Sequence, residues 1–564
     1  MYITPRFREL VRRFMMRFYD NDLLSPDRDQ LPGLASLLGL LAAPGLLLPL
    51  LLFLGSPSSL LPMHFRDIVS LGEKYLFVTL SLSSVGFVTV LEWDALFPDR
   101  RDYLVLCPQP VPMRTIFAAK ICSLVLFIGI FLAAVTGLTP LLFPAVVLGS
   151  APIANLLWFG TCHLFTVVAA CLFTFLSVIA VQGLFLTILP HRLFVKISPW
   201  LQLACLVGMV LQLLNSARAF SLLDYSRARN DWAVYVSPPM WFLGLYQYAL
   251  GWDKPVFRDL AHIGFLSLAG VAALAACAYA LAYKRHVMHC LEAAGVEDGA
   301  PSPLHRALSR LLESAATRRP LERAVFRFTL ITVRRSRKQR LYVSACAALG
   351  LAPIFQFLTF ALTAQDRAWL YRPSLAFAAI PFLLLSVLLP GLRHAYGIPA
   401  ELKANWVFRM AEPHDHRQIL TGIRRATLVL AVLPVSIGLL PLYVWFWGPV
   451  NAAVHTIVIL CVTLIGEEIL LFRFNKIPFT CSYVPGQSNV KSLWALYVIF
   501  VASLVTTLAE IELWILAQPW RVAFPLAVLA GFSSVRAWLS RRDAEPLVFD
   551  DEPDPVVRQL GLSV

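Results

Sequence analysis

The stretch LEWDALFPDRRDYLVLCPQPVPMRTIFAAK, residues 91–120, is a polar interruption in a strongly apolar chain. It lies between two runs, 75–91 and 121–190, that contain no Lys, Arg, Asp or Glu. Leu91 is both the last residue of the first run and the first residue of the stretch. Its own charged side chains are interspersed with four prolines, Pro98, Pro108, Pro110 and Pro112. A helix that crosses a bilayer needs about 20 apolar residues. The flanking runs therefore predict membrane spans, and the stretch predicts the loop that joins them.

The composition of the whole chain supports this interpretation. The protein has 564 residues, of which 58% are hydrophobic and only 15% are charged, and its mean hydropathy is +0.69. Soluble proteins carry about 25% charged residues, so the sequence predicts an integral membrane protein. The two longest uncharged runs must each hold two helices, broken near 140–152 and near 448–451. We expect about twelve spans, in the runs 31–63, 75–91, 121–190, 197–217, 260–283, 341–365, 373–392, 426–466, 492–509 and 522–535.

The predicted spans fall into two groups of six. The segments that we expect are an N-terminal segment 1–30, a first six-span unit 31–284, a basic linker 285–340, a second six-span unit 341–539 and a tail 540–564. The N-terminal segment contains PRFRELVRRFMMRFYD, which places Leu10, Phe14, Met15 and Phe18 opposite Arg8, Arg12 and Arg13 on a helix. This pattern predicts an amphipathic helix at the membrane interface. The linker contains a second such stretch, LERAVFRFTLITVRRSRKQR.

The charge distribution predicts an orientation. The formal net charge is +14, with 48 Lys and Arg. If the N-terminus lies in the cytoplasm, most of these residues fall in segments on that side, as the positive-inside rule expects. The basicity therefore indicates a cytoplasmic (inner) membrane protein with both termini inside, and it does not indicate nucleic-acid binding. The ten cysteines include no CxxC pair and predict neither a disulfide framework nor a metal site.

The two groups of spans resemble one another. The second group has its own polar insert after its second span, GLRHAYGIPAELKANWVFRMAEPHDHRQILTGIRRA. A shift of 303 positions superposes the two inserts without a gap, so that Pro110 meets Pro413 and Arg114 meets Arg417. The same shift brings the first five spans of one group over those of the other. We therefore expect an all-α polytopic protein built as two parallel six-helix repeats with interfacial amphipathic helices.

With these features the chain resembles the permease subunits of type-2 ATP-binding-cassette (ABC) exporters. The resemblance rests on the amphipathic N-terminal helix, the six spans, the segment EWDALFPDRRDYLVLCPQPVPMRTIFAAK and the aromatic segment SPPMWFLGLYQYALG at 237–251. In that family the first cytoplasmic loop contacts the ATPase, and short re-entrant helices lie on the outer side between spans 5 and 6. This chain departs from the commoner pattern because both halves are in one polypeptide and the second half lacks the outer segment.

The resemblance implies a set of residues that couple the permease to its ATPase. They are Glu92, Asp99, Arg100, Arg101, Pro108, Pro110 and Arg114 in the first half, and Glu401, Trp406, Pro413 and Arg417 in the second. Prolines restrict the backbone of such a loop and make it stiff. The chain has no GxxxxGK[ST] phosphate loop, so ATP would be supplied by a partner ABC ATPase subunit, and no catalytic residue, cofactor or metal is expected in this chain. The alternative for the loop is a solvated turn with interfacial arginines.

Two other function classes remain open. A twelve-span ion-coupled secondary transporter would share the six-plus-six layout, and DALFPDRRDY contains part of the loop signature of the major facilitators, without its glycines. Membrane-embedded acids are functional candidates, and Glu467 and Glu468, followed by Arg473, resemble the EExxxR motif of intramembrane glutamate proteases with one residue too many. Glu510 and Glu512 are expected at the interface beside Trp514. A metal site at EPHDH, 412–416, is a further alternative. The apolar, aromatic composition suits a hydrophobic or amphiphilic substrate.

Overall fold

The computed structural model is all-helical wherever the chain is described. It describes residues 5–19, 63–97, 109, 111–148, 152–214, 232–292, 317–363, 371–400, 416–472, 474, 476–480 and 494–542, and these contain no β-strand. The chain forms two compact units, Met1–Glu297 and Asp298–Val564. Within the described ranges, nine helical segments are long and apolar enough to cross a membrane. The prediction of a polytopic helical membrane protein is therefore confirmed.

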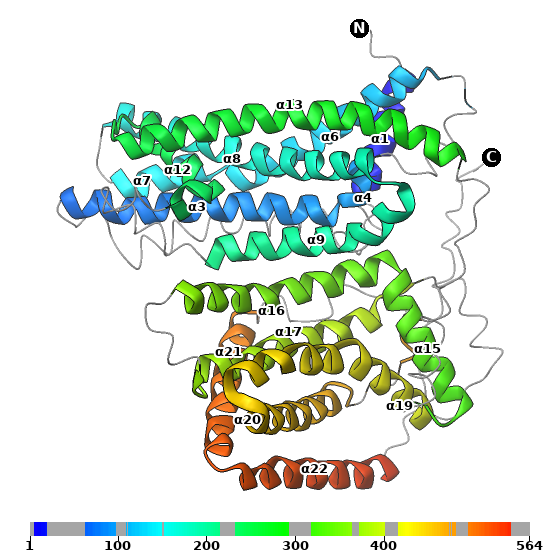
Figure 1. The fold of residues 1–564 in the computed structure, drawn as a ribbon. Coiled ribbons are helices and arrows are strands. Elements are labelled where there is room, and N and C mark those ends of the chain that lie inside the picture. The colour runs from blue at the N-terminus through cyan, green and yellow to red at the C-terminus, as the bar shows by residue number, and fades with distance from the viewer. Residues whose placement is uncertain are drawn as a thin grey trace, which may run out of the picture. The chain divides into compact units, whose positions relative to one another are not determined.

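The first unit consists of one amphipathic helix, five long apolar helical segments and several short elements (Figure 1). In chain order they are α1 (Pro5–Tyr19), α3 (Met63–Leu91), α4 (Trp93–Leu96), α6 (Met113–Thr136), α7 (Thr139–Leu148), α8 (Ile153–Ile188), α9 (His191–Leu214), α11 (Trp232–Val236), α12 (Pro238–Ala249) and α13 (Pro255–Glu292). The expected break of the run 121–190 is present, since α6, α7 and α8 are separate helices. The expected first span, 31–63, lies almost entirely outside the described residues.

Helix α1 packs its apolar side against the protein. Leu10, Phe14 and Phe18 are buried, and the Phe18 ring stacks on Phe127 of α6 with centroids 4.4 Å apart. Arg12 and Arg13 lie on the exposed side near Glu9. The predicted amphipathic helix is thus confirmed, and its apolar side packs against α6. Its position at the membrane interface stays a prediction.

Helix α12 is too short to cross a membrane. Its twelve residues span about 18 Å at 1.5 Å per residue, against about 30 Å of hydrocarbon. It turns at Gly251, which has a φ of +92°, and returns as α13. Glycines permit the close approach of these two helices, since a Cβ on Gly244 would lie 2.3 Å from Cβ of Leu260. Figure 1 shows α12 and α7 toward one end of this unit, and α1 and α4 toward the other.

The second unit repeats the pattern of an amphipathic helix followed by long apolar helices. Its elements are α15 (Pro320–Arg335), α16 (Arg337–Thr363), α17 (Leu375–Gly397), α19 (His416–Thr427), the π-helical turn η6 (Leu428–Val432), α20 (Leu433–Leu470), α21 (Trp494–Leu516), the short 3₁₀ turn η8 (Pro519–Val522) and α22 (Ala523–Arg542). Helix α21 reaches α22 through η8 alone, as the sequence predicts. Helix α22 forms over the shortest expected span, 522–535, and is not among the nine spanning segments.

Helix α20 folds back on itself at Gly448. This residue has a φ of +79° and a ψ of +167°, which lies outside helical geometry. The rings of Tyr443 and His455 have centroids 3.9 Å apart, whereas twelve residues of straight helix would separate them by about 18 Å. The expected break near 448–451 is therefore present, and 433–447 and 449–470 are two limbs. We call the end of the unit at Gly448 the fold-back end.

Candidate functional site

The structure describes three of the eleven candidate coupling residues, Glu92, Arg114 and Arg417. The other eight lie outside the described residues: Asp99, Arg100, Arg101, Pro108, Pro110, Glu401, Trp406 and Pro413. Glu92 is only 1% exposed and forms the turn between α3 and α4. Arg114 and Arg417 are exposed at the first turns of α6 and α19. The described candidates therefore lie where each polar loop enters the helical unit.

The segment 93–97, which leads into the first loop, is buried. Trp93 and Leu96 have no exposed surface, and Phe97 is 3% exposed. The short helix α4 begins here, with the amides of Ala95 and Leu96 donating hydrogen bonds to the Glu92 carbonyl at 2.8 and 3.2 Å. The large apolar side chains anchor this segment in the unit. We call residues 93–97 the first loop stem.

Three side chains from three different helices hold the carbonyl groups of this first loop stem. Lys120 Nζ of α6 donates to the Ala95 oxygen at 2.6 Å, and Gln182 Nε2 of α8 donates to the Trp93 oxygen at 2.8 Å. The hydroxyl of Tyr279, on α13, donates to the Leu96 oxygen at 3.4 Å. A displacement of the stem would therefore strain or break hydrogen bonds to three long helices. It would leave buried carbonyl groups unpaired, which is energetically costly.

Lys120 also connects the first loop stem to the amphipathic helix. Its side chain is fully buried, and Nζ lies 5.0 Å from the ring centroid of Phe14 and 4.8 Å from that of Phe18. A lysine ammonium over an aromatic face is attracted by the ring quadrupole. These contacts explain how a charged group is accommodated without exposure to solvent. Through Lys120 Nζ, helix α6 contacts both α1 and α4.

The second unit holds the corresponding segment in a similar way. At the end of α17, the Tyr396 oxygen accepts a hydrogen bond from the Phe479 amide at 2.8 Å. The Ile398 oxygen accepts one from Gln339 Nε2 of α16, also at 2.8 Å, and Gln339 is fully buried. We call residues 396–400 the second loop stem. The shift of 303 positions superposes Trp93 on Tyr396 and Ala95 on Ile398, so the same two carbonyls are held in both units although the donors differ.

The starts of α6 and α19 also correspond. Ile116 of α6 is buried in a cluster with Leu10 and Phe14 of α1, and Ile419 of α19 is buried in a cluster with Val325 of α15. Gly422 allows the close approach of α15, since a Cβ there would lie 2.8 Å from the Glu322 carbonyl oxygen. In each unit, then, the amphipathic helix packs on the first turns that follow the polar loop.

The acids of α20 are part of a charged cluster. Glu468 Oε1 lies 3.1 Å from Nη1 of Arg536 on α22 and 3.9 Å from Nη1 of Arg424 on α19. Glu467 is 3% exposed. Arg473, the expected partner, lies outside the described residues. The cluster connects α20 with α19 and α22 at the end of the unit opposite the fold-back, and Glu468 is paired with arginines from those two helices.

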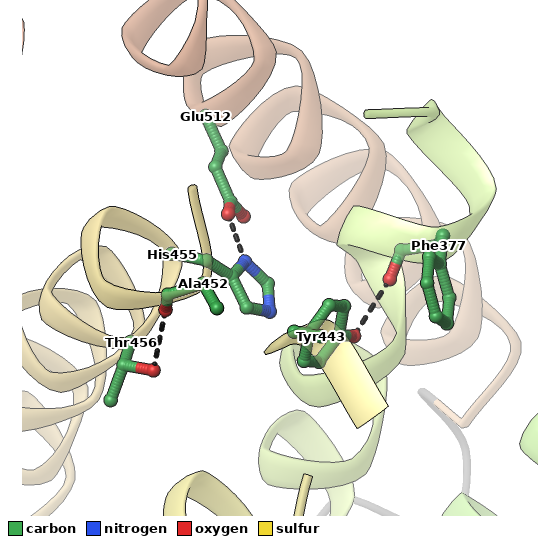
Figure 2. A network of polar contacts seen from close by, with 6 residues as sticks. All are labelled: Phe377, Tyr443, Ala452, His455, Thr456 and Glu512. Carbon is green, nitrogen blue, oxygen red and sulfur yellow. Dashed lines mark hydrogen bonds and ion pairs between the residues drawn. The ribbon is translucent and has the colours of Figure 1, made fainter. Parts of the chain in front are cut away.

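A second buried polar group lies at the fold-back end, and the sequence did not predict it (Figure 2). His455 Nδ1 contacts Glu512 Oε1, and neither side chain has any exposed surface. Glu512 was expected at the interface beside Trp514, and this expectation was wrong because the second limb of α20 covers that face of α21. Glu510 is exposed, as expected. His455 and Glu512 are 57 positions apart in the sequence, and the packing of α20 against α21 brings them together.

The first unit also has a buried polar group, at its α12 end. Lys74 Nζ of α3 donates to Gln247 Oε1 of α12 at 3.1 Å, and His163 Nδ1 lies 3.0 Å from the Tyr246 hydroxyl. Lys74 lies 18 positions before Glu92, or about 27 Å along α3. The polar contacts of α12 are therefore far from the first loop stem.

No metal-binding arrangement is present in the part of the chain that the structure describes. No group of three or more His, Cys, Asp or Glu side chains in that part could hold a metal ion. The motif EPHDH lies outside the described residues except for His416 at the start of α19.

The geometry thus presents two loop stems held by buried hydrogen bonds. In each unit an amphipathic helix packs on the first turns that follow the polar loop. The comparisons with known proteins find no relative: no family model matches the chain, no curated protein matches it, and no solved structure matches it.

Proposed function

We propose that this protein is the membrane permease of an ABC-type exporter. In this proposal a separate ATPase subunit hydrolyses ATP, and the chain couples the hydrolysis to efflux of a hydrophobic or amphiphilic substrate. The chain would contribute about twelve spans as two parallel six-helix repeats in the cytoplasmic membrane, with both termini in the cytoplasm. The chain itself would hold neither ATP nor a cofactor.

The observation that carries the proposal is the bonding of the first loop stem. A soluble ATPase can move membrane helices only through a stiff contact at the membrane surface. The first loop stem is bonded to α6, α8 and α13 through Lys120, Gln182 and Tyr279, and Lys120 also contacts α1. Residues bonded to several helices at once transmit a displacement to all of them, because packed interiors have low compressibility. A solvated turn would have no need of these bonds.

The correspondence of the two units supports the tandem arrangement. The carbonyls of Trp93 and Ala95 in one unit and of Tyr396 and Ile398 in the other are held by buried donors. Each unit also packs an amphipathic helix on the start of the helix after its loop. Two equivalent stems imply two docking sites, one for each ATPase subunit. Helix α12, too short to span, supports the resemblance to exporters with re-entrant outer helices.

The loop residues are assigned as the contact with the ATPase. Residues 94–114 and 403–417 would each fit a groove on an ATP-binding subunit, with Arg100, Arg101 and Arg114 available for its carboxylates. The loop sequences CPQPVPM and MAEPHDH differ, so the two contacts are chemically unlike. A heterodimeric ATPase, or a homodimer that binds asymmetrically, fits this difference.

The test is a pull-down of the full-length chain with its ATPase. Charge reversal, Arg100→Glu with Arg101→Glu, is expected to weaken association by about 2–5 kcal/mol, as for other interfacial charge pairs. Arg318→Glu with Arg319→Glu is the matched control, because these adjacent arginines are exposed and lie outside both loops. Undiminished binding and ATP-dependent transport after reversal, or after replacement of the loop by a Gly-Ser linker, would contradict the assignment.

The second candidate is an ion-coupled secondary transporter, which the buried His455–Glu512 pair favours. Co-purification separates the two, since only the ABC proposal requires an ATPase. Glu467→Gln is a further discriminator: under the ABC proposal Glu467 is structural, and ATP-dependent transport should remain mostly intact. Complete loss of transport in a folded Glu467→Gln variant would favour the ion-coupled transporter or an intramembrane enzyme.

A further inference from the structure

We infer that His455 and Glu512 form a proton-binding site within the second unit. The site goes beyond the proposed function, which requires no proton. His455 is on the second limb of α20 and Glu512 is on α21, and the two side chains point toward one another between these helices (Figure 2). Their contact is a direct one between the imidazole Nδ1 and a carboxylate oxygen.

Burial determines how many protons this pair holds. Both side chains are 0% exposed. With one dissociable proton added to a neutral imidazole and an ionised carboxylate, the pair has no net charge, whether the proton resides on nitrogen or oxygen. Without that proton the pair is an anion, and with two it is a cation. An isolated charge in a dry apolar interior is strongly disfavoured, so the pair retains one proton.

The remaining polar atoms of the pair have capacity for proton exchange. His455 Nε2 and Glu512 Oε2 are buried and have no hydrogen-bond partner among the described residues. An orphaned imidazole nitrogen and carboxylate oxygen near the fold-back are the atoms through which water can add or remove a proton if the contact opens. A coordinated metal is a poorer fit, because the described residues offer only these two ligands here.

Among the described residues, no further charged group contacts the pair to neutralise it directly. Tyr443 lies against the imidazole, with ring centroids 3.9 Å apart, and its hydroxyl donates to the Phe377 oxygen at 2.9 Å instead of to the pair. Trp447 stacks edge-on at 5.3 Å. The other described titratable or charged groups on the elements packed against the pair are engaged elsewhere or lie farther along. They are Cys461 and the Glu467–Glu468 cluster on α20, exposed Glu510 and Tyr497, bonded to the Ser386 oxygen, on α21, Arg521 of η8, bonded to the Trp514 oxygen, Arg536 of α22 on Glu468, and Arg393, His394 and Tyr396 at the far end of α17.

The proton would act on the contact between two packed helices. The pair joins α21 to the limb that begins just after Gly448, where the backbone already departs from helical geometry. A protonated pair is neutral and keeps the limb packed against α21. A deprotonated pair carries a buried negative charge, which favours entry of water and separation of the two helices. The site therefore links proton occupancy to the packing of the fold-back end.

The test counts protons on the full-length protein in detergent, without nucleotide or substrate. At about pH 8 a free imidazole is mostly neutral and a free carboxyl is ionised. We expect isotope-edited infrared and ¹⁵N NMR spectra of Glu- and His-labelled protein to show one proton retained, as an imidazolium or a protonated carboxyl. Glu512→Gln should remove one such signal, because the neutral imidazole that remains needs no further proton, whereas Glu510→Gln, the exposed neighbour on α21, should preserve it. His455→Gln should leave a protonated carboxyl at Glu512, because an isolated buried carboxylate is strongly disfavoured.

A wild-type spectrum with only neutral imidazole and ionised carboxylate signals at that pH would overturn the inference. So would a set of retained-proton signals that is unchanged in a folded Glu512→Gln protein. The wild-type spectrum is decisive by itself if that variant does not fold. Because the measurement uses no ATPase, its failure leaves the exporter proposal untouched, and loss of ATPase binding leaves the proton site untouched.

Discussion

Lys120, on α6, is a fully buried lysine whose ammonium group contacts two other elements of the first unit, α1 and α4. It donates to the Ala95 oxygen and lies over the rings of Phe14 and Phe18. Hydrogen bonds to charged donors contribute more than neutral ones do. This one side chain therefore determines how firmly the first loop stem is attached to α1 and α6.

Lys120→Met is expected to loosen the first loop stem without unfolding the unit. Methionine fills a similar volume but cannot donate to Ala95, and such a bond to a charged group contributes about 1.5–3 kcal/mol. Hydrogen exchange should show a decrease of that size in the free energy of local opening at 93–97. Lys196→Met, an exposed lysine on α9, should leave the exchange unchanged. Equal protection in all three proteins would mean that Lys120 does not anchor the stem.

At the scale of elements, the fold-back of α20 depends on one glycine. The φ and ψ of Gly448 fall in a region that is essentially reserved for glycine. No atom lies within 4 Å of a Cβ built there, so an alanine would be strained by its backbone and not by a clash. Gly438 lies in the regular part of the first limb and also has free space around a Cβ.

The two glycines therefore predict opposite effects of the same substitution. Gly448→Ala should lower the free energy of unfolding by about 1–3 kcal/mol, the usual cost of such backbone strain. Gly438→Ala should raise it by about 0.5–1 kcal/mol, because alanine is the better helix former. Thermal unfolding in detergent measures both. If the two variants shift the midpoint in the same direction, the hairpin in α20 is not formed as described.

The elements were predictable where a local pattern specifies them. The fold-back was predicted because 426–466 is too long an apolar run for one span, and Gly448 is its natural break. Helices α1 and α15 were predicted from the spacing of apolar and basic residues. The loop stem bonds and the His455–Glu512 pair were not, since Lys120 meets Ala95 and His455 meets Glu512 across 25 and 57 positions. No local pattern in the sequence specifies which distant side chain reaches a given carbonyl.

At the scale of the whole molecule, the orientation in the membrane is testable at described positions. Asp253 is exposed in the turn between α12 and α13, and Arg319 is exposed just before α15. Charge bias predicts the first position outside and the second inside. In a background without reactive native cysteines, an impermeant maleimide should label Asp253→Cys on intact cells, and should label Arg319→Cys only after permeabilisation. Labelling of Arg319→Cys on intact cells would overturn the predicted topology.

We propose that this chain transmits to the membrane the energy of ATP hydrolysis that takes place in another subunit. The sharpest test is purification of the intact chain from its native membrane in mild detergent, with a photo-cross-linking residue at position 100 or, as control, at position 253. We expect a complex with one ATP-hydrolysing subunit for each repeat, cross-linked from position 100 and not from position 253. A chain that purifies without any nucleotide-hydrolysing partner, yet moves substrate in response to an ion gradient alone, would contradict it.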